Sequence, residues 1–337
     1  MNVPWRFILA LPLGVLFGIL TFILFLYTQL GIPTHRSQWI YDISQKKERL
    51  AGQIPGPKLL IVAGSSGLFS INAQEIEQET HYPTINMATH AGLSLDYRLY
   101  RIEKTARPGD TVLLACEYEF YEDGFGEYSE INDDYILARD PEYFHNMSLL
   151  DKIHMATRIG FKRLQLGWRN RRHPEKVRPP SIPYSPYTPI TPGIDCLDEN
   201  GDEVFNLRAT RPPPSAAALE RPIPILVNGL SSDHTSGFRT LAAFLEWAKA
   251  HQIKVLASFP AAVRESAYDG PKAQQAIATI TRFYAAHGVP VIGSTDEVLF
   301  PADQFYDTMY HLTHEAALQR TEHLIPELAP YLHPNPQ

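Results

Sequence analysis

The chain has 337 residues, and its 30 basic and 37 acidic side chains give a formal net charge of −7. That balance excludes a general electrostatic affinity for nucleic acid, and the length is enough for one sizeable core with insertions or for two small cores. Only two cysteines occur, Cys116 and Cys196, so a disulfide framework and a cysteine-rich zinc site are excluded as well. One disulfide between them and two separate thiols both stay open, and we expect neither a metal nor a cofactor.

A long apolar segment lies near the amino terminus. Residues 7–32 form 26 consecutive uncharged positions, and at about 1.5 Å per residue a helix of that length exceeds the roughly 30 Å hydrocarbon core of a bilayer. The segment is too long for the apolar region of a signal peptide, and no small-residue cleavage site follows it cleanly. We therefore expect residues 1–34 to be an uncleaved transmembrane anchor, followed by a partly helical stem over residues 35–56.

Basic residues on the two sides of this segment bear on its orientation. Arg6 precedes the segment, whereas Arg36, Lys46, Lys47 and Arg49 follow it. By the positive-inside rule, this count favours a cytoplasmic body.

After the stem, short apolar runs alternate with helical patterns in two stretches, residues 57–116 and 223–330. Strands that alternate with helices of about ten to fifteen residues predict a parallel sheet covered on both faces. We therefore expect an α/β fold, a flavodoxin-like three-layer sandwich in which the two stretches form one core. The predicted strands span residues 58–63, 83–87, 110–116, 253–259 and 289–293, and the predicted helices span residues 70–79, 93–106, 237–251 and 271–287.

Residues 117–222 do not fit the alternation and are predicted to be a long, partly irregular insertion or lid. Residues 117–142 carry ten Asp or Glu against one Arg, and residues 158–178 are mostly basic. Apolar residues at helical spacing over 149–159 predict that the basic run begins on an amphipathic helix. Charge runs are ordinarily solvated surface, but these would also suit docking to lipid headgroups or to an anionic polymer. Proline-rich stretches follow at residues 174–192 and 212–214.

The first predicted strand ends abruptly in Gly64-Ser65-Ser66. An ordinary strand-to-helix turn with capping serines is one interpretation of this stretch. The other is a reactive serine at the carboxyl edge of the sheet, where α/β proteins gather their sites. Asp307 and His311 follow the last predicted strand and lie at the same edge. Serine, histidine and aspartate are the residue types of a nucleophile, its general base and the carboxylate that orients the base.

A Gly-x-Ser after the first strand, with an Asp and a His near the carboxyl terminus, resembles the SGNH (GDSL-like) superfamily of serine hydrolases and acyltransferases. The resemblance implies that Ser66 is the nucleophile, His311 the general base and Asp307 its orienter. Because the loops after the first and last strands both open on the carboxyl edge of the sheet, Ser66 and His311 are expected to approach to hydrogen-bond range or one water beyond it. Ser65 competes with Ser66, since only register separates them, and His314 is a less suitable base because an amphipathic helix is predicted to begin there. Three residues separate Asp307 from His311, where the family has two.

The same resemblance implies an oxyanion hole made by the backbone N–H groups of Ser66 and Gly92. The family's third donor is an asparagine side chain after the third strand, and Glu117 stands near that place here. An ionised carboxylate repels an oxyanion, so this departure favours either a divergent acyltransferase or a protein that binds without catalysis.

With Gly-Ser-Ser behind one membrane helix, the layout is most similar to D-alanine transfer proteins and anchored exopolysaccharide O-acetyltransferases, which work beside membrane-bound O-acyltransferases. We expect a membrane-anchored acyl hydrolase or O-acyltransferase that forms a Ser66 acyl-enzyme and acts on a cell-envelope glycan or lipid. Against the positive-inside count, the resemblance implies a body on the extracytoplasmic, periplasmic side of the inner membrane. Expected partners are the lipid bilayer, a membrane-bound O-acyltransferase and an anionic glycan or lipid. The alternative is a non-catalytic envelope protein of the same fold that serves as a binding or assembly partner in polysaccharide export or modification.

Overall fold

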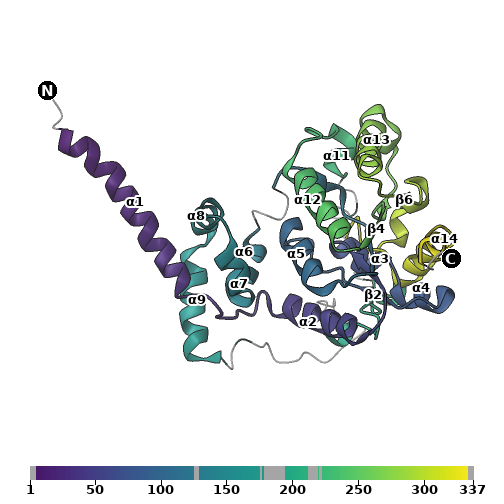
Figure 1. The fold of residues 1–337 in the computed structure, drawn as a ribbon, viewed down its shortest axis with the longest axis horizontal. Helices are drawn as coiled ribbons and strands as arrows, with labels where there is room; N and C mark the ends of the chain where they lie inside the picture. The colour runs from purple at the N-terminus through teal and green to yellow at the C-terminus, as the bar shows by residue number, and fades with distance from the viewer. Residues whose placement is uncertain are drawn as a thin grey trace. The chain divides into compact units, whose positions relative to one another are not determined.

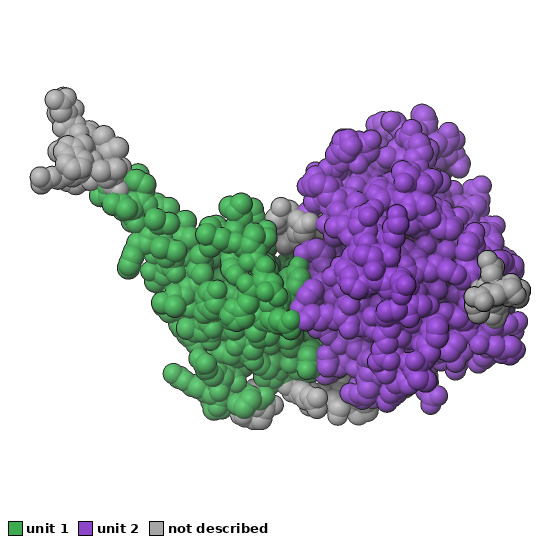
Figure 2. All heavy atoms as spheres, viewed as in Figure 1, with its two compact units in different colours: residues 1–41, 128–182 green, residues 42–127, 183–337 purple. Residues whose placement is uncertain are grey.

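The computed structural model describes residues 5–124, 129–174, 177, 194–211, 219 and 222–332. Its chain groups into two compact units, which Figure 1 draws as a ribbon and Figure 2 distinguishes by colour. Unit 1 comprises residues 1–41 and 128–182, and unit 2 comprises residues 42–127 and 183–337. The predicted insertion is thus divided between the units, with residues 128–182 in unit 1 and the rest of the insertion in unit 2.

Unit 2 is built on a five-stranded parallel sheet with the strand order β2-β1-β3-β4-β6. Leu60 of β1 stands opposite Ile85 of β2 and Val112 of β3, and the register continues to β4 and β6. Every residue of β1 and β3 is buried, as a parallel sheet covered on both faces requires. The predicted parallel α/β sheet is confirmed, and its strand order is consistent with a flavodoxin-like layout. The strands are β1 (Leu59–Val62), β2 (Thr84–Asn86), β3 (Thr111–Leu114), β4 (Lys254–Ser258) and β6 (Val291–Ile292).

Helices pack on both faces of this sheet (Figure 1). Leu60, Val62 and Val112 belong to one buried apolar cluster with side chains of α5, α11, α12 and α13. Leu59 and Ile61 alternate with them along β1 and so point to the other face, where α14 packs against α3 and α4. These helices are α3 (Ser65–Ser70), α4 (Ala73–Thr80), α5 (Leu95–Thr105), α11 (Pro224–Asn228), α12 (Ser236–Ala250), α13 (Pro271–Ala286) and α14 (His314–Leu332), and α2 (Gln38–Gln53) precedes the sheet.

Shorter elements complete the part of unit 2 that the structure describes. β5 (Ala262–Val263) and β7 (Leu299–Phe300) pair in parallel as a separate small sheet. The 3-10 helices are η1 (Tyr118–Tyr121), η3 (Ile194–Cys196), η4 (Arg208–Thr210), η5 (Ser266–Asp269), η6 (Asp296–Val298) and η7 (Ala302–Gln304). Cys116 and Cys196 are both buried free thiols, which decides between the two alternatives left open by the sequence.

The predicted helix over residues 70–79 corresponds to α4 (Ala73–Thr80), and a separate short helix that was not predicted, α3 (Ser65–Ser70), precedes it. Ile71 and Asn72 between them are extended, and the Asn72 side chain accepts a hydrogen bond from Glu75 N at 2.6 Å. Asparagine at this N-cap position satisfies an otherwise unpaired N–H and starts α4 there. The break separates the turn after β1, with its own short helix, from the following helix.

Unit 1 is helical in its described part. α1 is long and apolar enough to cross a membrane over Ala10–Tyr27, a property that a single-pass anchor shares with a signal sequence. The predicted amphipathic helix is confirmed as α8, and α9 carries much of the remaining basic run. The proline-rich stretches predicted at residues 174–192 and 212–214 lie, apart from Pro174 and Val177, outside the described residues. The helices are α1 (Trp5–Tyr27), α6 (Glu130–Arg139), α7 (Pro141–Asn146), α8 (Leu149–Arg158) and α9 (Phe161–Arg172).

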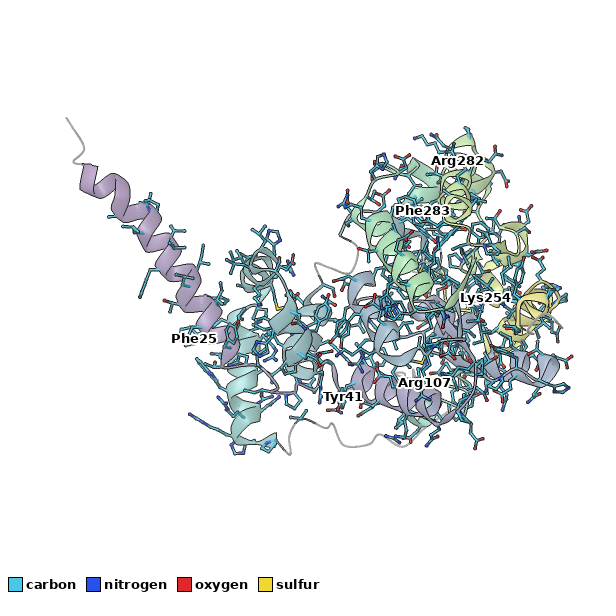
Figure 3. All side chains as sticks on the ribbon, in the orientation of Figure 1. Phe25, Tyr41, Arg107, Lys254, Arg282 and Phe283 are labelled. Carbon is cyan, nitrogen blue, oxygen red and sulfur yellow. The ribbon has the colours of Figure 1, made fainter. Side chains whose placement is uncertain are left out.

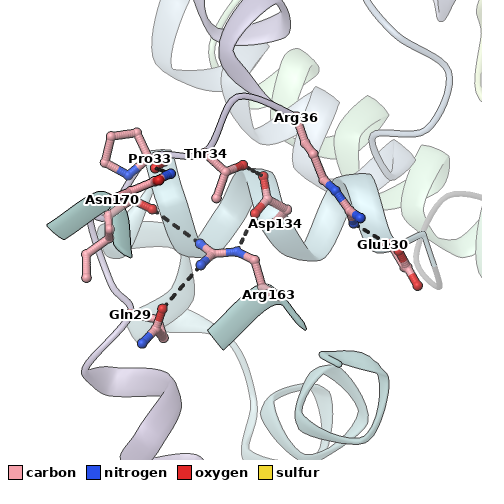
Figure 4. A network of polar contacts seen from close by, with 9 residues as sticks. Gln29, Pro33, Thr34, Arg36, Glu130, Asp134, Arg163 and Asn170 are labelled. Carbon is pink, nitrogen blue, oxygen red and sulfur yellow. Dashed lines mark hydrogen bonds and ion pairs between the residues drawn. The ribbon is translucent and has the colours of Figure 1, made fainter. Parts of the chain in front are cut away.

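Buried polar contacts hold the segment that follows α1 against α6 and α9 (Figure 4). Arg163 of α9 donates to Gln29 Oε1 and to the carbonyl oxygen of Ile32, both at 3.2 Å, and pairs with Asp134 of α6. Gly167 permits this approach, since a Cβ there would overlap Gln29 Oε1. The end of the apolar segment is therefore an integral part of unit 1.

Residues 194–211 return the chain to unit 2 beside β2. Asn86 Nδ2 donates to Asp202 Oδ1 at 2.9 Å, and the buried Lys47 of α2 donates to the carbonyl oxygen of Ala88 at 2.5 Å. Lys47 interacts electrostatically with Asp202 and Glu203. Burial raises the pKa of each of these two carboxyl groups to about 7 and lowers the pKa of Lys47 to about 7. Protonation of Lys47, Asp202 and Glu203 therefore affects how firmly residues 194–211 are held against unit 2.

The substitution Glu203→Gln is expected to remove part of the pH dependence of stability. Because burial raises the pKa of Glu203 in the folded state to about 7, ionisation favours the unfolded state, and the free energy of unfolding falls as the pH rises from about 4.5 to about 7. Over that window the wild type should lose up to about 3 kcal/mol relative to the variant. Denaturant unfolding of the full chain in detergent measures this difference. Glu199→Gln, at an exposed position, should keep the wild-type profile; parallel profiles for wild type and Glu203→Gln would contradict the prediction.

Candidate functional site

The turn after β1 carries the two candidate serines. Ser65 begins α3 and is half-buried, whereas Ser66 is fully buried. Ser66 Oγ makes no hydrogen bond to any residue that the structure describes. The backbone carbonyl oxygen of Ser66 accepts a hydrogen bond from Ser70 Oγ at 2.5 Å within α3. The hydroxyl predicted to be the nucleophile is therefore present at the carboxyl edge of the sheet, but it is covered.

Glu117 reaches this turn from the segment between β3 and η1. Its carboxylate accepts hydrogen bonds from Gly64 N at 2.8 Å and from Ser66 N at 2.9 Å. The approach depends on the absence of a side chain at Gly64, where a Cβ would overlap Glu117 Oε1. The sequence placed Glu117 near the family's third oxyanion donor. In the structure its carboxylate binds the Ser66 N–H itself, the group predicted to be the first oxyanion donor.

Two buried arginines, Arg98 and Arg320, interact electrostatically with the Glu117 carboxylate. Arg98 of α5 donates to the carbonyl oxygen of Ala63 at 2.5 Å and to that of His90 at 3.2 Å. Arg320 of α14 donates to the carbonyl oxygen of Ser70 at 3.2 Å. Burial lowers the pKa of both guanidinium groups, an effect that the negative charge of Glu117 opposes. Arg98 thus links the ends of β1 and β2, and Arg320 holds the last residue of α3, while Glu117 itself holds the turn at Gly64 and Ser66.

Asp307 and His311 lie on a tight loop before α14. Tyr306 N donates to the carbonyl oxygen of His311 at 2.6 Å, and His311 N donates to that of Thr308 at 3.3 Å. This turn brings Asp307 Oδ1 to 2.6 Å from His311 Nδ1, despite the extra residue between them. The pair is accessible, with 41% of the Asp307 side chain and 14% of the His311 side chain exposed. The structure therefore brings Asp307 and His311, the residues predicted to be orienter and base, into contact.

The His311 ring also packs on α3. It stacks on Phe69 with ring centroids 4.2 Å apart and an interplanar angle of 10°. Phe69 stands three residues after Ser66 in α3, and residues at this spacing are neighbours on a helix. His311 consequently lies beside the turn that carries Ser66, although no hydrogen bond joins the imidazole to Ser66 Oγ.

The loop after β2 contributes His90 and Gly92. Gly92 N donates to His90 Nδ1 at 2.8 Å. Burial, together with the positive charge of Arg98 and the proximity of His311, lowers the pKa of His90 to about 4. His90 is therefore neutral at physiological pH, and its Nδ1 can accept the Gly92 N–H. Both N–H groups predicted to form the oxyanion hole thus already have acceptors within the protein.

The structure brings Ser66, Asp307 and His311 to one edge of the sheet, with His90, Arg98 and Arg320 around them. Sequence reasoning did not identify these last three residues. The only sequence signal for His90 was its position two residues before Gly92, the predicted oxyanion donor. Arg98 and Arg320 occur in ordinary helical patterns, which give no such signal. No cluster of three or more His, Cys, Asp or Glu that could hold a metal occurs among the residues described.

Comparisons with known proteins give no family for this chain: no protein-family model matches it, and no curated protein matches it. The site must therefore be interpreted from its own geometry.

Proposed function

We propose that the chain is a membrane-anchored acyl hydrolase or O-acyltransferase of the SGNH type, acting through a Ser66 acyl-enzyme on a cell-envelope glycan or lipid. The observation that carries this proposal is the placement of His311. Its Nδ1 is bonded to Asp307, and its face is stacked on Phe69, one helical turn after Ser66. A carboxylate on Nδ1 favours the tautomer whose Nε2 can accept a proton from a serine hydroxyl.

In the proposed reaction, His311 Nε2 takes the proton of Ser66 Oγ while that oxygen attacks the carbonyl carbon of the acyl donor. The tetrahedral intermediate then breaks its bond to the leaving group, which takes the proton that His311 received from Ser66. Water or an acceptor hydroxyl then attacks the acyl-enzyme by the same steps in reverse. Glu117 and His90 accept hydrogen bonds from the N–H groups of Ser66 and Gly92. For these N–H groups to stabilise the oxyanion, the substrate must displace at least one of the two side chains.

The same two contacts favour a second candidate function, a non-catalytic envelope protein that serves as a binding or assembly partner. A carboxylate already bonded to Ser66 N fills the place where an oxyanion would be stabilised, and the serine hydroxyl beside it is covered. A site in this state binds its own side chain instead of a reaction intermediate. In this function Ser66, Glu117 and Arg98 would only hold the sheet edge together.

Reaction with a fluorophosphonate probe separates the two functions. The detergent-solubilised full chain should be labelled on one serine, and Ser66→Ala should abolish the labelling because the probe captures only an activated hydroxyl. Ser65→Ala is the matched control and should label like wild type. Labelling that is lost with Ser65→Ala instead would move the nucleophile by one residue, and no labelling of a folded wild type would favour the non-catalytic function.

For the location, we propose an uncleaved single-pass anchor in the inner membrane with a periplasmic body. Leu26 and Gln29 are fully buried in unit 1, so removal of the apolar helix as a signal peptide would remove part of a folded core. The proposed partners are the bilayer, a membrane-bound O-acyltransferase and an anionic glycan or lipid.

A topology assay tests the side of the membrane. A phosphatase fused to the carboxyl terminus should be active, because this reporter folds only outside the cytoplasm, and a cytoplasmic reporter at the same place should be silent. The four basic residues that follow the helix oppose this orientation. The reverse pattern of the two reporters would place the body, and its substrate, in the cytoplasm.

A further inference from the structure

We propose that unit 1 makes a second membrane contact beside α1, in which exposed residues of α8 and α9 lie in the headgroup layer and bind anionic phospholipid. This contact requires that α1 crosses a membrane and is independent of the chemistry at Ser66. The residues concerned, which we call the α8–α9 surface, are Leu149, Leu150, Phe161, Lys162, Trp168, Arg169 and Arg172.

Large apolar side chains of the α8–α9 surface are open to solvent. Leu149 and Leu150 begin α8 and are 63% and 66% exposed, and Phe161, which begins α9, is 65% exposed. Leu149 and Leu150 are adjacent in the chain, and large apolar residues exposed side by side ordinarily mark a site that binds a partner or a membrane. α1 has equally exposed apolar side chains, so lipid that surrounds α1 can also cover these residues.

Ring contacts place this surface at the end of α1 that enters unit 1. Phe25, labelled in Figure 3, packs edge-on against Trp168 with centroids 6.2 Å apart. Tyr27 packs against Phe144 at 5.3 Å, five residues before Leu149. Trp and Tyr side chains concentrate where hydrocarbon meets water. Tyr27 and Trp168, both partly exposed, therefore indicate that this boundary lies at the level of the α8–α9 surface.

α9 has two different faces. Arg163 and Asn170 bind the segment after α1, with Asn170 Nδ2 donating to the carbonyl oxygen of Pro33 at 3.0 Å. Phe161, Trp168 and Arg172 stand at i, i+7 and i+11 and share the opposite stripe of the helix. The first face attaches α9 to the rest of unit 1, which leaves the second face for a partner.

The exposed side of α9 is basic, because Lys162, Arg169 and Arg172 are all exposed. The acidic side chains of α6 are each paired with an arginine: Glu130 with Arg36, Asp133 with Arg158 and Asp134 with Arg163. Lys162, Arg169 and Arg172 have no carboxylate partner within the described part of the chain. Cations beside exposed apolar residues are attracted to an anionic lipid surface. A soluble anionic glycan would neutralise the cations but leave Leu150 and Phe161 in water, so lipid suits the whole surface better.

A polarity-sensitive fluorophore at Leu150→Cys tests the contact in the full chain. The protein is placed in nanodiscs of phosphatidylcholine, with or without phosphatidylglycerol, and unsubstituted protein gives the background from the buried Cys116 and Cys196. In anionic discs we expect quenching by lipids that carry a spin label near the headgroup, and protection from iodide in the water. Protection should be lost in Lys162→Gln/Arg169→Gln/Arg172→Gln, and it should weaken in high salt.

The matched control is Lys249→Gln/Lys272→Gln/Arg282→Gln, which removes the same charge from exposed positions of unit 2 and should retain the protection. The proposal would be overturned if iodide quenches the label in anionic discs as strongly as it quenches the free conjugate of the fluorophore with cysteine. Protection that is equal in both lipids and unchanged by the α9 substitutions would overturn the part played by anionic lipid. Protection seen only when an acidic polysaccharide is added would assign the surface to a glycan.

Discussion

Asp307→Asn should fold like the wild type and lose about four orders of magnitude in turnover, the scale of the corresponding change in serine proteases. The structure gives the reason, because Asp307 Oδ1 lies 2.6 Å from His311 Nδ1. An amide can donate to Nδ1, which would favour the tautomer with the proton on Nε2 and leave no acceptor for the Ser66 proton. Hydrolysis of a simple aryl ester, or the rate of fluorophosphonate labelling, measures the loss.

Asp303→Asn provides a matched control just before the same loop, since Asp303 is exposed. Its contact with Arg211 is made by the backbone carbonyl oxygen, which accepts a hydrogen bond at 3.3 Å and is unchanged by the substitution. This variant should retain wild-type turnover. If Asp307→Asn also behaves like the wild type while Ser66→Ala is inactive, the enzyme is a Ser–His dyad and Asp307 only shapes the loop. If neither substitution changes any activity, the non-catalytic function is the better account.

The arrangement of the sheet could be predicted because it depends on patterns that are local in the sequence. Buried apolar runs such as Leu59–Val62 and Thr111–Leu114 occur between helical patterns of sufficient length, and that alternation permits few arrangements other than a parallel sheet. The grouping of the insertion could not be predicted in the same way. It depends on contacts such as Arg163 with Gln29, 134 positions apart, which have no signature in the periodicity of either segment.

The candidate site could be predicted only in part for the same reason. Asp307 and His311 are neighbours on one loop, so their spacing alone suggested that they interact. Glu117 was noted as an unsuitable charge in an oxyanion region, but its hydrogen bonds run to Gly64 and Ser66, 53 and 51 positions away. Whether a carboxylate in that region repels an intermediate or binds the turn itself depends on side-chain direction, which composition and spacing do not contain.

Glu117→Ala should lower the free energy of unfolding by about 2 to 6 kcal/mol, since it leaves two buried N–H groups, those of Gly64 and Ser66, without an acceptor at roughly 1 to 3 kcal/mol each. Gly64→Ala should cost a similar amount, because its Cβ would overlap Glu117 Oε1 and push the carboxylate off the turn. Denaturant unfolding of the full chain in detergent measures both effects.

The double variant Gly64→Ala/Glu117→Ala shows whether the two losses have one cause. Once the carboxylate is gone, the methyl group added at position 64 has no carboxylate to displace, so the double variant should be about as stable as Glu117→Ala alone, with an interaction energy as large as the cost of Gly64→Ala. Gly52→Ala, at a helical glycine with open space around it, should not destabilise the protein. Strictly additive losses would mean that Glu117 does not hold the turn. Under the catalytic function, Glu117→Ala also frees the Ser66 N–H, so fluorophosphonate labelling of Ser66 should become faster even as stability falls.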